Sequence, residues 1–269
     1  MSIKKNSEIL ESSLLNNGIL RINLNNPVNL NALSEKMINL LQINLDKAAT
    51  DKKIRVIIIS AEGTAFSSGH DLKEIKLARK KPDKGKIFFK NIMKKCSKMM
   101  QSIIKNPKPV IAEISGTATA AGCQLVASCD LAYANKNAKF ATPGVNIGLF
   151  CSTPMVALSR NLSNKHAMEM LLTGDLISSD KAHKIGLING VLENDNLRNF
   201  VQKQAIKISN KSSLTLKIGK EAFYKQIDMP LSKAYNYASQ VMVENMLKLD
   251  AKEGIDAFLE KREPHWKDK

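Results

Sequence analysis

The chain has 269 residues, a hydrophobic fraction of 43%, a charged fraction of 25% and a formal net charge of +16 at pH 7. This length and composition predict a globular protein with one large domain, or one domain and a smaller appendage. A membrane-spanning helix is not expected, because no run approaches the roughly 18 continuous apolar residues that such a helix needs.

The first residues favour a cytoplasmic protein. The segment Met1–Glu8 lacks the apolar stretch and the small-residue cleavage site of a secretory signal. Glu8 and Glu11 argue against a mitochondrial transit peptide.

Cysteine and histidine usage gives no sign of a metal site. The cysteines form no Cys-x-x-Cys pair, and the four histidines are scattered. We therefore expect reduced, buried thiols and no bound metal.

The positive charge is concentrated in one region. Between Lys73 and Lys108 there are thirteen Lys and Arg against two acids, Glu74 and Asp83. A phosphorylated ligand, an anionic membrane surface or nucleic acid would each suit this charge, and so would a helix face exposed to solvent.

The N-terminal region alternates predicted strands, loops and helices. Residues 9–15 and 18–24 form a predicted hairpin around Asn16-Asn17-Gly18. Ser34 caps a predicted helix with apolar residues at helical spacing. Residues 54–60 are a predicted buried strand, and a Gly/Ser loop follows at 63–69.

The pattern continues and then becomes helical. A basic helix begins near residue 86 and ends before Pro107, followed by a strand at 109–115 and a small-residue loop at 116–122 that enters another helix. This order predicts an α/β fold with parallel strands. Predicted helices at 196–209, 213–226, 231–249 and 252–262 divide the chain into an α/β core, 1–195, and a helical region, 196–269.

Two glycine-containing loops are the candidate site. Each follows a buried strand and leads into a helix, where backbone N–H groups are free and the helix dipole is positive. Two such N–H groups aimed at one point would stabilise a thioester oxyanion or an enolate. Neither loop matches a phosphate-binding motif, and taken alone such turns also serve tight packing.

With their surroundings, these loops resemble the crotonase (enoyl-CoA hydratase/isomerase) superfamily. Ser68-Gly69-His70-Asp71-Leu72 and Ala120-Ala121-Gly122-Cys123-Gln124-Leu125 look like its two oxyanion loops. The segment 26–33 looks like its Pro…Asn-Ala-Leu stretch, and 140–148 occupies its Phe-x-x-Pro-Glu-x-x-x-Gly segment. The resemblance covers nearly the whole chain. Residues 118–130 and 144–154 look especially like one branch of this superfamily.

The resemblance implies a crotonase-like ββα spiral core and a C-terminal helical trimerisation tail, with trimers often pairing into hexamers. It places the oxyanion N–H groups on His70 and Ala121 and implies an acyl-CoA substrate, so that coenzyme A is part of the substrate and no separate cofactor is needed. The substrate-binding residues that it implies are Ser68, Gly69, Asp71, Leu72, Lys73, Gly122, Lys261 and Arg262.

The sequence departs from the family pattern at both catalytic glutamates. Gln124 and Gly144 occupy those positions. A neutral amide cannot take a proton from water, and glycine has no side chain, so most of a hydratase's rate should be missing. The oxyanion pair would survive this loss.

Other polar residues are weaker candidates. The His70 side chain is expected to point away from the carbonyl, Glu113 to form a structural ion pair, and Asp71 to cap a helix. Asp130 is expected to serve packing, and no histidine that would activate a thiol stands near Cys123 or Cys151 in sequence. The remaining candidates, His166 and His183, are expected at the surface or in the core.

The sequence thus predicts an enoyl-CoA hydratase/isomerase-like protein that binds acyl-CoA in fatty-acid or other acyl-CoA metabolism. It either runs a reaction that needs only enolate stabilisation or binds acyl-CoA without efficient turnover. The expected assembly is a homotrimer or hexamer, with no membrane partner. RNA binding by the basic helix ranks lower, because Lys84–Lys98 has no arginine and no aromatic spacing suited to base stacking.

Overall fold

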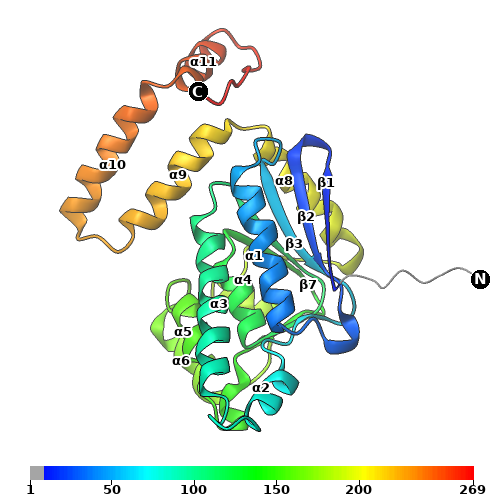
Figure 1. Ribbon diagram of the computed structural model, residues 1–269. Coiled ribbons are helices and arrows are strands. Elements are labelled where there is room, and N and C mark those ends of the chain that lie inside the picture. The colour runs from blue at the N-terminus through cyan, green and yellow to red at the C-terminus, as the bar shows by residue number, and fades with distance from the viewer. Residues whose placement is uncertain (1–8) are drawn as a thin grey trace, which may run out of the picture.

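The computed structural model describes residues 9–269 as an α/β core with a projecting helical tail (Figure 1). The main sheet has the strand order β1-β2-β3-β5-β7-β10. Its first pair is antiparallel and the other pairs are parallel. The strands are β1 (Leu10–Leu15), β2 (Ile19–Leu24), β3 (Val56–Ala61), β5 (Val110–Ile114), β7 (Leu131–Asn135) and β10 (Gly190–Leu192).

A second, smaller sheet continues the strands of the first. It consists of β4 (Ala65–Ser67), β6 (Thr117–Thr119), β8 (Lys139–Ala141) and β9 (Ile177–Ser178), in that order. The first three strands follow β3, β5 and β7 along the chain and pair in parallel. This repeated β-β-helix unit confirms the predicted fold class. The strands β4 and β6 lie inside the predicted loops at 63–69 and 116–122. The sequence did not predict them, because strands of three residues are too short to show a periodic pattern.

Helices cover both faces of the main sheet. On one face lie α1 (Glu35–Thr50), α3 (Lys86–Lys105) and α4 (Ala121–Ser128), which share a large apolar core with alternate residues of the strands. On the other face α8 (Leu197–Ser209) packs on Ile19, Ile58 and Ile111. The predicted division of the chain at residue 195 stays a prediction. The helix α8 lies after this position and packs on the main sheet.

Local signals in the sequence placed several elements. The predicted turn at Asn16–Gly18 joins β1 to β2, and Asn17 and Gly18 both have positive φ angles, 64° and 71°. The Ser34 side chain accepts a hydrogen bond from the Met37 N–H and so caps α1, as predicted. The remaining elements before the tail are η1 (Asn16–Gly18), η2 (Pro27–Asn29), α2 (Leu72–Ala78), η3 (Pro143–Ile147), α5 (Ser152–Leu158), α6 (Asn164–Thr173), α7 (Ser179–Lys184) and η4 (Asn194–Asn196).

The tail consists of α9 (Ser213–Gln226), α10 (Leu231–Met246) and α11 (Leu249–Leu259). In Figure 1, α9 and α10 form a hairpin that projects from the core. Large apolar side chains are exposed along the last two helices and the turn between them, among them Leu247 at 81% and Phe258 at 82%. An apolar face of this kind marks an interaction surface.

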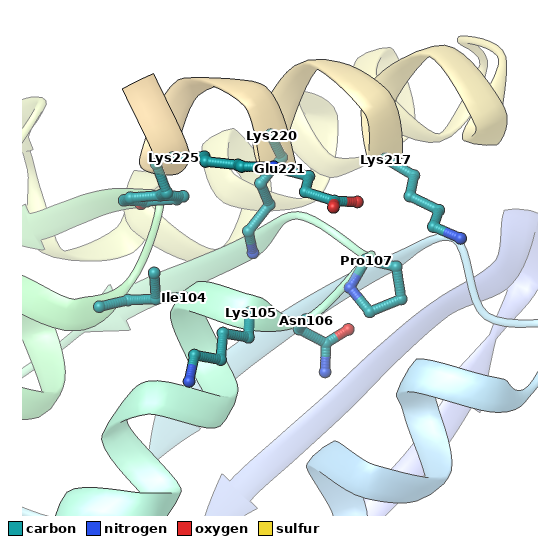
Figure 2. Close-up of a pocket in the computed structure, with 9 residues that line it drawn as sticks. Ile104, Lys105, Asn106, Pro107, Lys217, Lys220, Glu221 and Lys225 are labelled. Atoms are coloured by element: carbon teal, nitrogen blue, oxygen red, sulfur yellow. The ribbon is translucent and has the colours of Figure 1, made fainter. Parts of the chain in front are cut away.

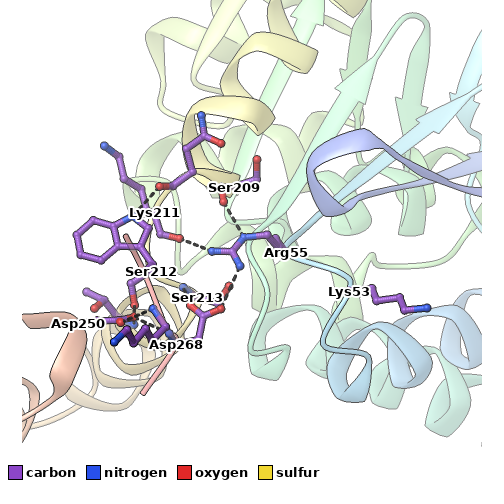
Figure 3. Close-up of polar contacts among 12 residues, drawn as sticks. Lys53, Arg55, Ser209, Lys211, Ser212, Ser213, Asp250 and Asp268 are labelled. Atoms are coloured by element: carbon purple, nitrogen blue, oxygen red, sulfur yellow. Dashed lines mark hydrogen bonds and ion pairs between the residues drawn. The ribbon is translucent and has the colours of Figure 1, made fainter. Parts of the chain in front are cut away.

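Polar contacts fix the point where the tail leaves the core (Figure 3). Arg55 donates hydrogen bonds to the carbonyl oxygens of Ser209 and Lys211, at 2.7 and 2.8 Å, and pairs with Asp268 at 3.0 Å. The buried Asp250 carboxylate accepts hydrogen bonds from the Ser212 hydroxyl and the Asp268 N–H, at 2.5 and 3.0 Å. The direction of the tail is therefore set by contacts between segments far apart in sequence.

Candidate functional site

The two predicted loops lie against each other. A Cβ at Gly69 would lie 2.9 Å from the Ala120 Cβ and 3.1 Å from the Ala121 nitrogen, and a Cβ at Gly122 would lie 2.2 Å from the Ser67 carbonyl oxygen. The glycines are thus needed because the two backbones approach too closely for a side chain.

Neighbouring residues hold this arrangement in place. The Thr119 hydroxyl donates to the Ser68 carbonyl at 3.1 Å, and the Leu33 N–H donates to the Gly69 carbonyl at 2.7 Å. Asn31 is fully buried, and its side chain donates to the Ala65 carbonyl at 2.7 Å. Thr119 and Asn31 were not predicted to have these roles, because their partners are distant in sequence.

Two amide groups in the loops remain free. Within residues 9–269, neither the His70 N–H nor the Ala121 N–H donates a hydrogen bond to the protein. Ala121 is the first residue of α4, so its amide lies at the positive end of the helix dipole. Ala120 before it has φ 50° and ψ −119°, a conformation rare for a residue with a side chain. Free amides and backbone strain of this kind are features of binding sites.

His70 is half-buried, and both of its ring nitrogens are buried. Neither ring nitrogen forms a hydrogen bond within the described part of the chain. Burial lowers the pKa of His70, although a backbone contact with Leu33 works in the opposite direction. A neutral imidazole can exchange a proton only if a ligand or water reaches one of its nitrogens.

The two positions without glutamate are both buried. Gln124 is 5% exposed, and its Oε1 atom has no hydrogen-bond partner among the described residues. A Cβ at Gly144 would lie 2.6 Å from the Leu149 carbonyl oxygen and 2.9 Å from the Cys151 sulfur. Gly144 does not have a positive φ, so lack of space, and not the backbone conformation, opposes a side chain there.

The thiols near these positions are poor nucleophiles. Burial raises the pKa of Cys123 to about 12 and also raises the pKa of Cys151. All four cysteines are free and buried, as predicted. Nucleophilic chemistry by a thiolate is therefore not favoured.

The other acidic candidates are part of the scaffold. Glu113 forms a buried bidentate ion pair with Arg21, at 2.8 and 2.9 Å. Its strand neighbours Ala112 and Ile114 belong to the α4 side of the sheet, so Glu113 faces α8 on the opposite side. This confirms the predicted structural pair.

Asp130 connects the core to the tail. Its carboxylate accepts hydrogen bonds from the Val110 N–H at 2.7 Å and the Tyr224 hydroxyl at 3.0 Å, and it pairs with Lys220 at 2.6 Å. Burial raises the pKa of Asp130 and lowers that of Lys220, and the ion pair opposes both shifts. The predicted packing role is confirmed.

The two other histidine candidates lie on α6 and α7. His183 is exposed on α7, and His166 is half-buried on α6 beside Glu169. No group of three His, Cys, Asp or Glu suited to a metal ion occurs in residues 9–269.

The residues implied for coenzyme A do not all meet within one chain. Asp71 caps α2 by accepting the Lys73 N–H at 2.8 Å, and the Lys73 side chain is exposed. Lys261 and Arg262 follow α11, at the opposite end of the molecule from α2 in Figure 1. Arg262 also pairs with Glu253 and Glu260, at 2.7 and 2.6 Å.

A separate cavity lies between the end of α3 and α9 (Figure 2). Lys105, Lys217 and Lys225 line it together with Glu221. It is outside the predicted site, and its lysine-rich lining results from the packing of α9 on the core. Of the described helices, none is long and apolar enough to cross a membrane.

Comparison with known proteins shows similarity to proteins named for enoyl-CoA hydratase. The sequence profile described as enoyl-CoA hydratase/isomerase matches residues 15–269. Enoyl-CoA hydratase domain-containing protein 3 of Xenopus laevis is 49% identical over 93% of this chain and 83% of its own length. The crystal structure of its human counterpart is 46% identical, with a TM-score of 0.91 over 96% of this chain and all of that one. An enoyl-CoA hydratase from Mycobacterium smegmatis has a TM-score of 0.92 and 42% identity, over 97% and 99% of the two chains.

These matches confirm the branch that residues 118–130 and 144–154 indicated, and they correct one prediction. The frog, rat, mouse, human and zebrafish relatives are all named mitochondrial, so the prediction of a cytoplasmic protein is wrong. That prediction depended on Met1–Glu8, which lies outside the described residues, and on the acidic Glu11.

Proposed function

Because the chain belongs to the enoyl-CoA hydratase/isomerase family, we propose that it binds acyl-CoA thioesters and holds their carbonyl oxygen between the amides of His70 and Ala121. The observation that carries this proposal is the pair of free N–H groups on two loops in contact. Two donors fixed in advance stabilise an oxyanion without reorganising when charge develops.

The proposed chemistry is enolate stabilisation without hydration. Gln124 can hold water or a substrate group through its unpartnered Oε1 atom, but it cannot accept the proton of that water. No carboxylate stands at Gly144, and Cys123 is held as a neutral thiol. Acyl-CoA binding without efficient turnover is the alternative within the same site, and a product screen across acyl-CoAs separates the two.

RNA binding is a weaker candidate. The exposed side of α3 carries Lys90, Lys94 and Lys98, which would attract a phosphate backbone. The aromatic residues of this helix, Phe88 and Phe89, are half-buried and contact each other, so they offer no platform for base stacking. RNA binding that depends on salt and persists at saturating CoA would favour this candidate.

We also propose that the tail assembles a homotrimer or hexamer. The exposed apolar side chains of α10 and α11, which include Met242, Met246 and Phe258, would be covered by a second copy. Assembly could also bring Lys261 of one copy toward the site of another, since the two ends are separate in one chain.

Lys73 is proposed to bind a CoA phosphate. Lys73 directly follows the first loop, and its side chain is exposed. Among the described residues, this side chain donates a hydrogen bond to Asn29 Oδ1 at 3.1 Å and to no other group. Replacing Lys73 with Ala should therefore weaken binding of an acyl-CoA several-fold and leave the matching pantetheine thioester unaffected. Calorimetry with both ligands, repeated at two salt concentrations, measures this difference.

The control for that prediction is Lys203→Ala on the distant helix α8, which removes the same charge. It should change neither affinity. Equal weakening of both ligands by Lys73→Ala would mean that the phosphates bind elsewhere.

A further inference from the structure

The end of the molecule formed by α2 and the start of α3 carries a dense positive charge. Between Leu72 and Lys90, which we call the basic end, there are eight Lys and Arg and two acids. None of these eight cations pairs with a carboxylate among residues 9–269. Among the described residues, no ion pair offsets the charge of the basic end.

The two acidic side chains of the basic end accept hydrogen bonds from backbone N–H groups. Glu74 accepts a hydrogen bond from the Glu35 N–H at 2.9 Å. Asp83 accepts hydrogen bonds from the N–H groups of Gly85 and Ile87, at 3.0 and 2.9 Å. Both carboxylates thus accept backbone hydrogen bonds, and neither forms an ion pair with a lysine among the described residues.

Exposed apolar side chains lie among these cations. Leu72, Leu77 and Ile87 are 54%, 63% and 67% exposed. The aromatic rings of the segment, Phe88 and Phe89, are half-buried. A surface with cations and exposed aliphatic side chains fits charged headgroups with acyl chains beneath them, whereas nucleic acid would call for exposed aromatic rings.

We propose that the basic end docks the protein on the surface of an anionic lipid bilayer. Charge complementarity and the aliphatic side chains both favour this partner. The basic end contains α2, which lies at the opposite end of the molecule from α11 in Figure 1. The expectation of no membrane partner depended on the lack of a spanning segment, which surface docking does not require.

Docking would place the site close to the lipid surface. Asp71 ends the first loop and caps α2, the first helix of the basic end. An amphiphilic thioester leaving the bilayer would then meet the loop directly. The docking itself does not depend on the function proposed for that loop.

Co-sedimentation with vesicles tests the proposal. The full chain should bind vesicles of phosphatidylcholine mixed with phosphatidylserine, should not bind pure phosphatidylcholine, and should be released as salt is raised. Replacing Lys76, Lys80 and Lys84 with Gln should lower binding about five-fold for each lysine, roughly a hundredfold in all. Acyl-CoA affinity should not change, because Lys73 is retained.

A matched variant separates position from total charge. Lys165, Lys203 and Lys207 are exposed on α6 and α8, and their replacement by Gln removes the same charge elsewhere. This control should retain vesicle binding. Leu77→Ser with Ile87→Ser should lower it several-fold without changing net charge.

Three outcomes would overturn the proposal. The first is no binding to the mixed vesicles by the folded protein. The second is an equal loss in the control variant, which would show a general charge effect. The third is binding to single-stranded RNA in preference to vesicles, abolished by the Lys76, Lys80 and Lys84 replacements, which would assign the basic end to nucleic acid.

Discussion

Purified protein should hydrate crotonyl-CoA at least about 10⁴-fold more slowly than a family member with glutamates at both catalytic positions. Each placed acid or base contributes ~10²–10⁴-fold, and Gln124 and Gly144 supply neither. The paired amides still polarise the carbonyl, an effect worth ~10²–10³-fold in rate, but they deliver no proton. A spectrophotometric assay that follows loss of the enoyl double bond measures the rate.

Installing carboxylates at both positions tests whether the missing glutamates cause the slow hydration. Gln124→Glu with Gly144→Glu should raise hydration above either single variant. The gain should be limited, because a Cβ at position 144 lies 2.6 Å from the Leu149 carbonyl oxygen and the 143–147 segment must shift. Gln124→Leu, with similar bulk and no acidic group, is the matched control and should leave the rate at its baseline.

A wild-type rate close to that of an ordinary hydratase would contradict this account. His70 would then be the first residue to replace, since both of its ring nitrogens are unpartnered. Glu113 would not be a candidate, because it is paired with Arg21 on the other side of the sheet.

Crowding the contact between the two loops should have a second large effect. A Cβ at position 122 would lie 2.2 Å from the Ser67 carbonyl oxygen, so Gly122→Val must push the loops apart. Separation of the two amides should lower acyl-CoA affinity at least about tenfold, as expected for the loss of a hydrogen bond to a polarised carbonyl. Calorimetry on protein that still unfolds cooperatively measures this change.

Gly219→Ala is the control for this prediction. A Cβ at position 219 meets nothing within 4 Å, and the residue lies in α9. Its replacement should leave affinity unchanged and favour the helix slightly. Unchanged acyl-CoA affinity in folded Gly122→Val would mean that the loops do not hold the carbonyl.

The sequence predicted the parts of the fold that depend on local signals. The turn at Asn16–Gly18, the Ser34 and Asp71 caps and the basic helix that ends before Pro107 were all predictable, because each depends on residues within a few positions. The second sheet was not, since its strands have two or three residues and pair across large sequence distances.

Contacts between residues far apart in sequence also could not be predicted. An ion pair could be predicted for Glu113 because a carboxylate in an apolar strand needs a partner, but nothing local identified Arg21, 92 residues away. In the same way, the glycines of both loops were recognised by their motifs, whereas their contact with Ser67 and Ala120 depends on the pairing of β4 with β6. The proposed roles of His70 and Ala121 come from the family resemblance and not from any local pattern.

The most direct test of carbonyl binding by the two amides is the ¹³C NMR shift of an acyl-CoA labelled at its thioester carbonyl. On binding, the resonance should move downfield, because two hydrogen bonds withdraw electrons from the carbonyl, and the shift should shrink in Gly122→Val at ligand saturation. A bound ligand whose carbonyl resonance stays at the position of the free thioester would contradict the account.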